Sequence, residues 1–474
     1  MITGSVLFLL FEWFIRLGML VVVTRRRRLG SAMAWLLVIF FEPIIGWVLY
    51  LMIGNYRLPR RRLTRHRRLL QELREVSERF QGHPHVVHPD LSARLATTVR
   101  LAERLGYMPI LGGNAVELIA ETDAAVNRIV ADLDAAQHHA HLLFYIWGDD
   151  ETGRRVGNAL VRAAGRGVKC RVLVDGVGSA RMLKRLAPRL IAQGVEVHPA
   201  LPVNPFRRRM ARVDLRNHRK LVVIDGRIGY TGSQNLINAS YGHKDLAWHD
   251  LMARLTGPVV LELQAVFLQD WYFETDAVLE QSGIFPEPEL AGEIPIQTLP
   301  SGPNYTTENY QRMVVDAVHE AQRYVTITTP YFVPDEPFLQ ALETAVQTGV
   351  TVTLIVPRRC DQILVGAATR AYYRDLLEAG VRIFLYEECL LHAKTMTIDD
   401  EIAFFGTSNF DIRSFTLDFE INLILYGAEA TRQLRLQQEE YLKQSTRLTL
   451  EDWEKRPAPQ KVFQNVTKLL SPLL

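Results

Sequence analysis

His218-Arg219-Lys220-Leu221-Val222-Val223-Ile224-Asp225 and His392-Ala393-Lys394-Thr395-Met396-Thr397-Ile398-Asp399 are two copies of one pattern, 174 residues apart. Both copies read His-x-Lys-x4-Asp, and each continues after six residues into a tail of the form Gly-Ser/Thr-x-Asn. The tails are Gly232-Ser233-Gln234-Asn235 and Gly406-Thr407-Ser408-Asn409. A single His-x-Lys-x4-Asp is expected by chance in about one chain in a hundred, but two copies with matching tails are not. The repetition therefore predicts a duplicated fold whose two motifs face each other across a pseudo-two-fold axis.

The sequence around each copy is repeated as well. Each half has a helical stretch, an apolar strand, a second helix and a second apolar strand. The predicted helical stretches are 115–140 and 310–323, and the predicted strands are Leu142–Trp147 and Val168–Val174 in the first half and Tyr324–Thr329 and Val350–Val356 in the second. Strands that alternate with helices of this length predict an α/β fold, used here twice.

The local sequence of the motif predicts where its side chains point. Leu221–Ile224 is a short apolar run that ends in Asp225-Gly226, a strong signal for a β-hairpin turn. His218 and Lys220 are two residues apart on the strand that enters this turn, so we expect their side chains on the same face. The second copy repeats the arrangement. Two imidazoles and two ammonium groups at one site supply a nucleophile, an acid and fixed positive charge, which suits a phosphodiester substrate.

The motif has two other interpretations. A surface imidazole beside a hairpin is the ordinary interpretation of one copy, and the duplication argues against it. A metal centre is the second alternative. Lysine is not a usual metal ligand, and no third histidine, cysteine or carboxylate is grouped with either copy. We therefore expect neither a metal nor another cofactor.

Two apolar stretches precede the motifs, Val6–Val23 and Ser31–Ile53, which are 18 and 23 residues long. Each is long enough to cross a hydrocarbon core of roughly 30 Å as a helix. A cleaved signal peptide carries its charge before the apolar region and has no second span, and a buried core hairpin is not bracketed by arginines. We expect two transmembrane helices, with Glu42-Pro43 kinking the second and Glu12 pairing with Arg16 in the first. A re-entrant hairpin that does not cross fully is the alternative.

Positive charge is concentrated at the N-terminal end. Residues 1–68 carry twelve arginines against Glu12 and Glu42, a net +10, so the rest of the chain carries −7 of the total of +3. A nucleic-acid enzyme is expected to spread positive charge over its catalytic body, so we expect no nucleic-acid partner. Seven arginines follow the second apolar stretch and four lie between the two, which places the body in the cytoplasm by the positive-inside rule. The cysteines, Cys170, Cys360 and Cys389, form no closely spaced framework and agree with a reducing compartment.

The chain divides into six predicted segments. They are two transmembrane helices in 1–55, a basic juxtamembrane and helical connector in 56–111, a first half in 112–273, an acidic, proline-containing linker in 274–296, a second half in 297–450 and an amphipathic tail in 451–474. The basic and apolar stretch 205–212 suits docking on anionic headgroups or a plain solvated charge run. The tail suits an interfacial helix or a cap on the core.

These residues resemble the phospholipase D superfamily, whose hallmark is the duplicated His-x-Lys-x4-Asp motif with its Gly-Ser/Gly-x-Asn tail. Within it, the chain is most similar to bacterial membrane-anchored cardiolipin synthases. The resemblance covers essentially the whole chain and includes the paired apolar stretches and the runs Arg212-x-Asp214-Leu215-Arg216-Asn217 and Asp411-x-Arg413-Ser414. It implies two phospholipase D-like halves, a bacterial inner-membrane location, and a covalent phosphohistidine on His218 with His392 as acid and base.

The resemblance also assigns supporting residues. It implies that Lys220, Lys394, Asn235 and Asn409, with the hydroxyls of Ser233 and Thr407, hold the substrate phosphate. Each imidazole also needs an orienting carboxylate. Asp225 and Asp399 are the motif's own acids, and the alternative role for them is to fix the hairpin turns. The family places a further carboxylate against each histidine, some twenty-odd residues on, and Asp250 and Glu420 match that place.

The leading hypothesis is phosphatidyl transfer from one phosphatidylglycerol to another, giving cardiolipin and glycerol, on a membrane rich in anionic lipid. A hydrolytic phospholipase D, or another phosphatidyltransferase, uses the same site with a different acceptor. A nuclease of the superfamily is disfavoured by the acidic body and the apolar stretches. A non-catalytic membrane scaffold would tolerate decay of one motif, and neither motif has decayed. The sequence makes no prediction of the oligomeric state.

Overall fold

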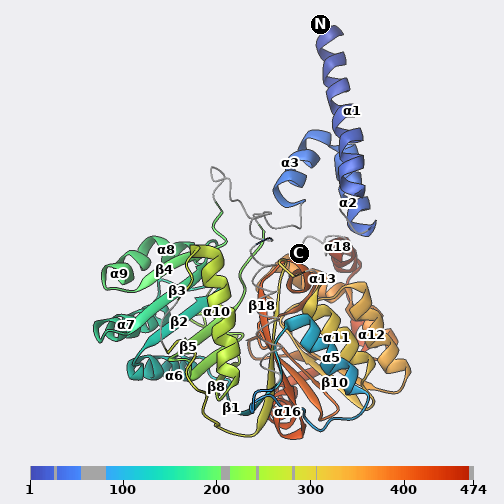
Figure 1. Cartoon of the computed structure of the whole chain (residues 1–474). Helices are drawn as coiled ribbons and strands as arrows, with labels where there is room; N and C mark the ends of the chain where they lie inside the picture. The colour runs from blue at the N-terminus through green and yellow to red at the C-terminus, as the bar shows by residue number, and fades with distance from the viewer. Residues whose placement is uncertain are drawn as a thin grey trace. The chain divides into compact units, whose positions relative to one another are not determined.

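The computed structural model describes residues 2–25, 29–54, 64, 82–203, 214–241, 245–279, 283–305 and 307–468 (Figure 1). It forms two compact units, one containing the N-terminal helices and the other the duplicated α/β body. The predicted arginine runs 26–28 and 57–68, the stretch 205–212 and the last residues of the tail lie outside the described residues, apart from isolated positions.

The N-terminal unit contains three apolar helices, α1 (Ile2–Thr24), α2 (Leu29–Phe41) and α3 (Pro43–Ile53). Only α1, among the described helices, is long and apolar enough to cross a membrane, with a mean hydropathy of 2.3 over Gly4–Thr24. Within it Arg16 pairs with Glu12 at 3.2 Å, as the sequence predicts.

The predicted pair of transmembrane helices is supported in part: α1 is a candidate span, and the second apolar stretch forms two shorter helices, α2 and α3. Glu42 leaves the helical region, with φ −131° and ψ 79°, and Pro43 starts a new helix. The rings of Trp35 and Tyr50 meet at a centroid distance of 5.3 Å, whereas a straight helix would separate residues fifteen apart by about 22 Å. Therefore α3 folds back on α2. Neither helix, at 13 and 11 residues, reaches the roughly 20 residues that a crossing requires, and the arrangement matches the re-entrant alternative.

The body is built on one continuous sheet with a repeated strand order. The order is β19-β13-β12-β10-β15-β16-β18-β9-β1-β8-β6-β5-β2-β3-β4, in which each half contributes the same succession read outward from the β9–β1 junction. The first-half strands are β1 (Leu111–Ile119), β2 (His139–Phe144), β3 (Lys169–Asp175), β4 (Glu196–Ala200), β5 (Lys220–Ile224), β6 (Ile228–Gly232) and β8 (Met252–Thr256). The second-half strands are β9 (Ile294–Ser301), β10 (Tyr324–Thr328), β12 (Thr351–Pro357), β13 (Arg382–Tyr386), β15 (Thr395–Ile398), β16 (Ile402–Gly406) and β18 (Glu420–Tyr426), with β19 (Ser445–Leu448) at the edge. This order confirms the predicted pseudo-two-fold duplication.

Helices cover both faces of the sheet because alternate residues of its buried strands point to opposite sides. Leu221 and Val223 of β5 belong to the core under α10 (Val259–Thr275), while Val222 and Ile224 belong to the core under α6 and α7. The remaining helices are α5 (Leu95–Gly106), α6 (Thr122–Ala135), α7 (Glu151–Gly165), α8 (Ala180–Arg185), α9 (Ala187–Ala192), α11 (Asn309–His319), α12 (Glu336–Gln347), α13 (Ile363–Ala371), α14 (Tyr373–Ala379), α15 (Ile412–Thr416), α16 (Ala428–Lys443), α17 (Leu450–Glu454) and α18 (Ala458–Lys468). Both faces are therefore buried, as in other α/β folds.

Two local predictions are corrected by the structure. The predicted helix 115–140 begins with the second part of strand β1, because Ala115–Ile119 pairs with β8, while β9 pairs with the first part of the same strand at Leu111 and Asn114. Pairing within the sheet outweighs the helical preference of the Ala-Val-Glu-Leu-Ile sequence. The connector 56–111 was predicted to be basic and helical, and in its described part the helix is limited to α5. The predicted hairpin is confirmed: β5 and β6 pair antiparallel around Asp225-Gly226.

Candidate active site

Both motifs begin at the carboxyl ends of the parallel strands. Strand β5 runs antiparallel to β2, so that Lys220 lies opposite Phe144, the last residue of β2. In the second half Thr395 of β15 lies opposite Thr328, the last residue of β10. Ligands of open α/β sheets bind outside this edge. The fold therefore delivers both histidines, which immediately precede these strands, to the edge where a site is expected.

Backbone pairing across the two halves brings the motifs together. The two-residue strands β7 (Trp248–His249) and β14 (Leu390–Leu391) pair in parallel, and the backbone N–H of His392 donates to His249 O at 2.8 Å. On the other side of the axis, the N–H of His218 donates to Phe419 O at 2.9 Å. Each histidine thus donates its backbone N–H to the residue that immediately precedes an acid of the opposite half.

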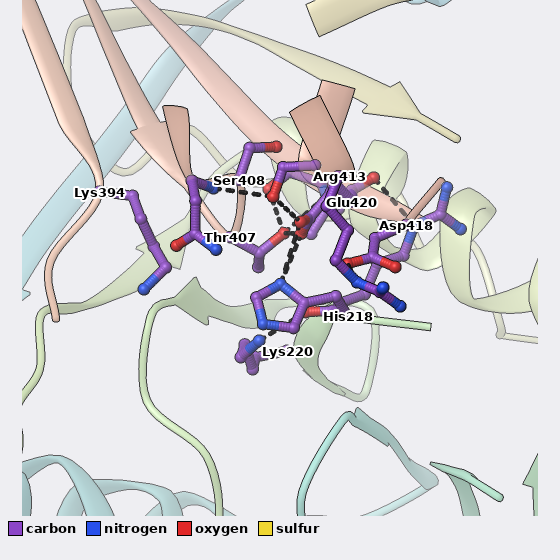
Figure 2. Close-up of polar contacts among 12 residues, drawn as sticks. His218, Lys220, Lys394, Thr407, Ser408, Arg413, Asp418 and Glu420 are labelled. Atoms are coloured by element: carbon purple, nitrogen blue, oxygen red, sulfur yellow. Dashed lines mark hydrogen bonds and ion pairs between the residues drawn. The ribbon is translucent and has the colours of Figure 1, made fainter. Parts of the chain in front are cut away.

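Each orienting carboxylate consequently contacts the histidine of the opposite half. His218 Nδ1 lies 3.0 Å from both carboxylate oxygens of Glu420, and Figure 2 shows this contact beneath the Glu420 side chain. His392 Nδ1 lies 2.6 Å from Asp250 Oδ1. The sequence identified both acids but not which histidine each would face. In both rings the carboxylate engages Nδ1, which leaves Nε2 as the nitrogen for chemistry.

The hydroxyls of the motif tails hold these carboxylates. Ser233 donates to Asp250 at 2.7 Å, and Thr407 donates to Glu420 at 2.5 Å (Figure 2). Ser414, at the start of the short helix α15, donates to the other Glu420 oxygen at 2.8 Å. Ser233 and Thr407, predicted to bind substrate, are therefore placed behind the imidazoles, where they position the acids.

The lysines and histidines share one electrostatic environment. Burial lowers the pKa of Lys220 to about 8, and burial together with the Lys220 charge holds the pKa of Lys394 well below its usual value. Each ammonium donates to the backbone carbonyl of the histidine two residues before it, at 2.6 and 2.5 Å. Two buried ammonium groups whose pKa values are lowered by burial form a site that favours an anion.

Both imidazoles favour the neutral form, because the pKa of each ring is lowered. Burial, followed by the charges of Lys220 and Lys394, holds the pKa of His218 well below its usual value. Burial and the charge of Lys394 lower the pKa of His392 to about 4, although Asp250 opposes the shift. Because lysines of both halves act on each ring, the four groups form one site rather than two separate ones.

The two carboxylates differ in their own protonation. Burial raises the pKa of Glu420 to about 7, in spite of Lys220 and its two hydroxyl donors. Burial also works to raise the pKa of Asp250, but His392, Lys394 and Ser233 outweigh it, so that the net shift is downward. The two halves, although related by duplication, therefore give their histidines unequal partners.

The motif aspartates lie at the hairpin turns and not against the imidazoles. Asp225 accepts the backbone N–H groups of residues 137, 138 and 139, each at 2.8 Å. Asp399 accepts those of residues 322, 323 and 324 in the same way and also pairs with Arg94 at 3.1 Å. Both residues have a positive φ of 52°. These contacts agree with the alternative that the aspartates fix the turns, and they do not support a role in the chemistry.

The two asparagines of the tails are buried beside the site. Asn235 Oδ1 accepts a hydrogen bond from the backbone N–H of Ile146 at 3.1 Å. This bond joins the motif tail to the segment just after strand β2. The side-chain oxygen of Asn409 is buried and has no partner within the described part of the chain, while its backbone N–H donates to Ser414 at 3.1 Å. Of the two, Asn409 keeps capacity for a ligand.

Several residues of the site were not predicted from the sequence. The ring of Tyr145 lies 4.9 Å from that of His218 and 5.4 Å from the ammonium of Lys220. Arg219, between the motif residues, is fully buried; it donates to Asp270 at 2.7 Å and to the backbone carbonyl of Glu420 at 3.0 Å. Arg219 therefore ties the first half to the strand that carries the acid of the second. Arg219 could have been identified from the sequence, because it lies between His218 and Lys220 in the motif.

Comparisons with known proteins agree with this geometry. The family model described as "Cardiolipin synthase, PLD-like domain" matches residues 129–271 and 314–441, one segment in each half. The chain belongs to the cardiolipin synthase family. A second model, "Phospholipase_D-nuclease N-terminal", matches residues 15–55.

Relatives and a solved structure extend the match over most of the chain. The chain is 36% identical to cardiolipin synthase A of Pectobacterium carotovorum over 471 residues, 98% of this chain and 97% of that protein. It is 35% identical to cardiolipin synthase A of Escherichia coli, again over 98% and 97% of the two chains. Its fold is similar to that of phosphatidylserine synthase of Haemophilus influenzae, with a TM-score of 0.58 at 17% identity over 80% of this chain and 100% of the other. The family thus supports both the predicted phospholipase D-like fold and its duplication.

Proposed function

We propose that this chain transfers a phosphatidyl group between two phosphatidylglycerol molecules, giving cardiolipin and glycerol. Membership of the family supports an enzyme that acts on a membrane phospholipid. The single observation that carries the proposed chemistry is the crossed pair of imidazole–carboxylate contacts, His218 with Glu420 and His392 with Asp250. It gives one site two imidazoles, each with Nε2 available.

In the first step, the Nε2 lone pair of His218 attacks the phosphorus of the donor. The bond from phosphorus to the glycerol oxygen breaks, and His392 gives its Nε2 proton to that oxygen, so that glycerol leaves. In the second step, a hydroxyl of another phosphatidylglycerol gives its proton to His392, and its oxygen attacks phosphorus while the bond to His218 breaks. Both steps conserve protons, and the protonated His392 is restored.

The unequal carboxylates support this division of roles. A general acid must hold a proton, and an ionised carboxylate beside the ring stabilises the imidazolium. Asp250, whose pKa is lowered, provides such a partner for His392. Glu420, whose pKa is raised to about 7, provides a weaker counter-charge for His218, which has to remain neutral to attack.

Substrate binding raises the pKa of His392, so that the ring takes up the proton it needs from solvent. Burial and the Lys394 charge lower the pKa of His392 to about 4. An anionic phosphodiester between Lys220 and Lys394 offsets this positive charge and raises the pKa of the ring. The lysines then stabilise the charge that develops on the phosphate oxygens in the transition state.

The test is product analysis with the purified full-length protein and phosphatidylglycerol in mixed micelles. Transfer produces cardiolipin and glycerol in equal amounts, and a His218→Asn variant that remains folded produces neither. Phosphatidic acid as the main product would instead favour the alternative, a hydrolytic phospholipase D with water as acceptor. Full turnover by His218→Asn would rule out the assigned nucleophile.

We also propose a topology in which α1 crosses the inner membrane once and α2–α3 re-enters from the cytoplasmic side. The fold-back of α3 on α2 supports it, since Trp35 and Tyr50 meet at 5.3 Å. Such a hairpin leaves the arginines after α1 and those after α3 on one side, and the positive-inside rule then makes that side cytoplasmic for both groups. Two full crossings would place the first group outside.

The topology is tested by a Thr24→Cys variant, because Thr24 is an exposed residue at the end of α1. A membrane-impermeant maleimide should fail to label it in intact spheroplasts and should label it after lysis. The wild-type chain is the control, since its own three cysteines lie in the part of the chain after α3. Labelling of Thr24→Cys in intact spheroplasts would contradict the single crossing.

A further inference from the structure

The helices α13 and α18 expose an apolar surface on the second half of the body. Among the described helices after α3, only these two carry more than one exposed large hydrophobic side chain. The exposed residues, which we call the apolar rim, are Ile363, Leu364, Val462, Phe463 and Val466, with exposed fractions of 79%, 47%, 62%, 47% and 54%. Apolar side chains gathered in this way mark an interaction surface more often than scattered ones do.

The orientation of α18 shows that its apolar residues are not used to pack the body. Gln464 and Thr467 form its buried face, with exposed fractions of 3% and 1%, and the carboxamide of Gln464 accepts a hydrogen bond from Arg456. Val462 and Val466 lie on the opposite side of the helix, and Phe463 lies at the margin of the buried face, with all three side chains exposed. A helix that buries polar residues and exposes apolar ones is arranged for a partner beyond the body.

A cavity with excess positive charge adjoins the apolar rim. Its volume is about 390 Å³, and its charged lining consists of the cations Arg370, Arg374, Arg456, Lys461 and Lys468 and the acids Asp375, Glu378 and Glu454. Lys468 pairs with Asp375, and Arg374 with Glu378. The side chains of Arg370 and Lys461 instead donate to backbone carbonyls, at 2.8 and 2.7 Å. The lining therefore holds cations that no carboxylate neutralises among the described contacts.

The basic cavity and the apolar rim are contiguous. A second cavity of about 200 Å³ is lined by Ile363, Ala367 and Phe463, and it shares Arg370 and Gln464 with the first. A ligand that lies across this boundary meets fixed positive charge at one end and apolar side chains at the other. That pattern is complementary to an anionic phospholipid.

The same surface lies beside the active site. Tyr331, whose ring is 6.4 Å from that of His392, donates its hydroxyl to Asp361 at 2.7 Å. Gln362 donates to the same hydroxyl at 3.3 Å, and Ile363 of the apolar rim follows directly in the sequence. A bilayer surface held at the rim would therefore lie close to the histidine that handles the leaving group.

We propose that the α13–α18 surface docks on the bilayer interface. The apolar rim enters the boundary between headgroups and acyl chains, and the basic cavity binds the phosphate of an anionic phospholipid. The inference goes beyond the proposed reaction, since it requires anionic lipid at this surface but no turnover.

The test is photocrosslinking of the full-length protein in lipid nanodiscs. A Phe463→benzoylphenylalanine variant should give a covalent phospholipid adduct, detected by mass spectrometry. A Leu436→benzoylphenylalanine variant is the matched control, because Leu436 is 46% exposed on α16, at the other end of the body (Figure 1). We expect no lipid adduct from the control. An absent adduct at residue 463, or a crosslink from it to a second protein chain, would overturn the proposal.

A second comparison tests the preference for anionic lipid. In nanodiscs that contain equal amounts of phosphatidylglycerol and phosphatidylcholine, the adduct at residue 463 should contain mainly phosphatidylglycerol. Lys461→Gln should reduce this preference about fivefold, the effect expected for one basic residue at an anionic surface. Lys443→Gln on α16 should not change it. Equal capture of both lipids would refute the anionic site. Repeating the experiment with His218→Asn separates docking from turnover, since the adduct must persist.

Discussion

Glu420→Gln removes the carboxylate that the second half supplies to His218. In the wild type this carboxylate contacts His218 Nδ1 at 3.0 Å and accepts hydrogen bonds from Thr407 at 2.5 Å and Ser414 at 2.8 Å. Glutamine has the same shape but only one acceptor oxygen, and its NH2 group can donate. One of the three donors therefore loses its acceptor, and the counter-charge for the ring is lost.

The size of the effect follows from these contacts. A hydrogen bond to a charged group is worth about 1.5–3 kcal/mol, and each 1.36 kcal/mol in the barrier is about a factor of ten in rate. We expect kcat to fall by about 10- to 150-fold. A larger loss would mean that the amide also selects the wrong imidazole tautomer, which costs about 10⁴-fold in a serine protease triad.

The assay is initial-rate cardiolipin formation in mixed micelles, with the thermal unfolding midpoint measured in parallel. Glu262→Gln is the matched control. Glu262 is also buried, and burial raises its pKa to about 8, so that it is already protonated at neutral pH. It lies on α10 and contacts none of the motif residues through a hydrogen bond in the described structure. We expect the control to retain wild-type kcat. A folded Glu420→Gln enzyme with unchanged kcat would refute the crossed pairing as a catalytic arrangement.

Four further outcomes are expected. Thr407→Val removes one donor to Glu420 and should lower kcat about fivefold, equivalent to about 1 kcal/mol, in the same assay. Arg219→Met leaves Asp270 buried without its ion pair and should lower the free energy of unfolding by about 3–5 kcal/mol in urea titrations, with part of the loss restored by adding Asp270→Leu. Asp225→Asn should weaken the turn by about 1–3 kcal/mol without lowering kcat of the folded enzyme; a large loss of kcat at full stability would return Asp225 to the chemistry. Inorganic phosphate should bind more weakly as pH rises through the pKa of Lys220, about 8, because the anion favours the protonated amine. The affinity should fall by at most about tenfold per pH unit for each linked proton. Calorimetry that finds no pH dependence of phosphate binding would contradict this.

The repeated motif predicted the duplication because both its spacing and its surroundings recur in the sequence. The hairpin at Asp225-Gly226 was also readable, since its turn signal is local. The sequence did not show that Asp250 and Glu420 each contact the histidine of the opposite half. Both acids follow their motifs at similar spacing, and only the backbone pairing across the axis, of β7 with β14 and of His218 with Phe419, decides which imidazole each one contacts. That pairing joins segments more than 140 residues apart, which no local pattern encodes.

In the N-terminal helices and the tail, too, tertiary contacts decide features that the sequence did not predict. Pro43 indicated a kink in the second apolar stretch, but composition could not show that α3 turns back onto α2, because that depends on contacts such as Trp35 with Tyr50. The apolar residues of the tail suited either an interface or a core. Tertiary packing settles their orientation: Gln464 is buried and Phe463 is exposed.

The most direct test of the central claim is to locate the covalent intermediate. A His392→Asn variant, with its acid and base removed, should accumulate a phosphatidyl adduct when incubated with phosphatidylglycerol bearing a good leaving group, quenched in base and digested for mass spectrometry. The account predicts an acid-labile adduct on His218, at no more than one per chain and absent from a His218→Asn/His392→Asn double variant. An adduct on any other residue, or none during measurable turnover, would contradict the claim that both halves build one site with His218 as its nucleophile.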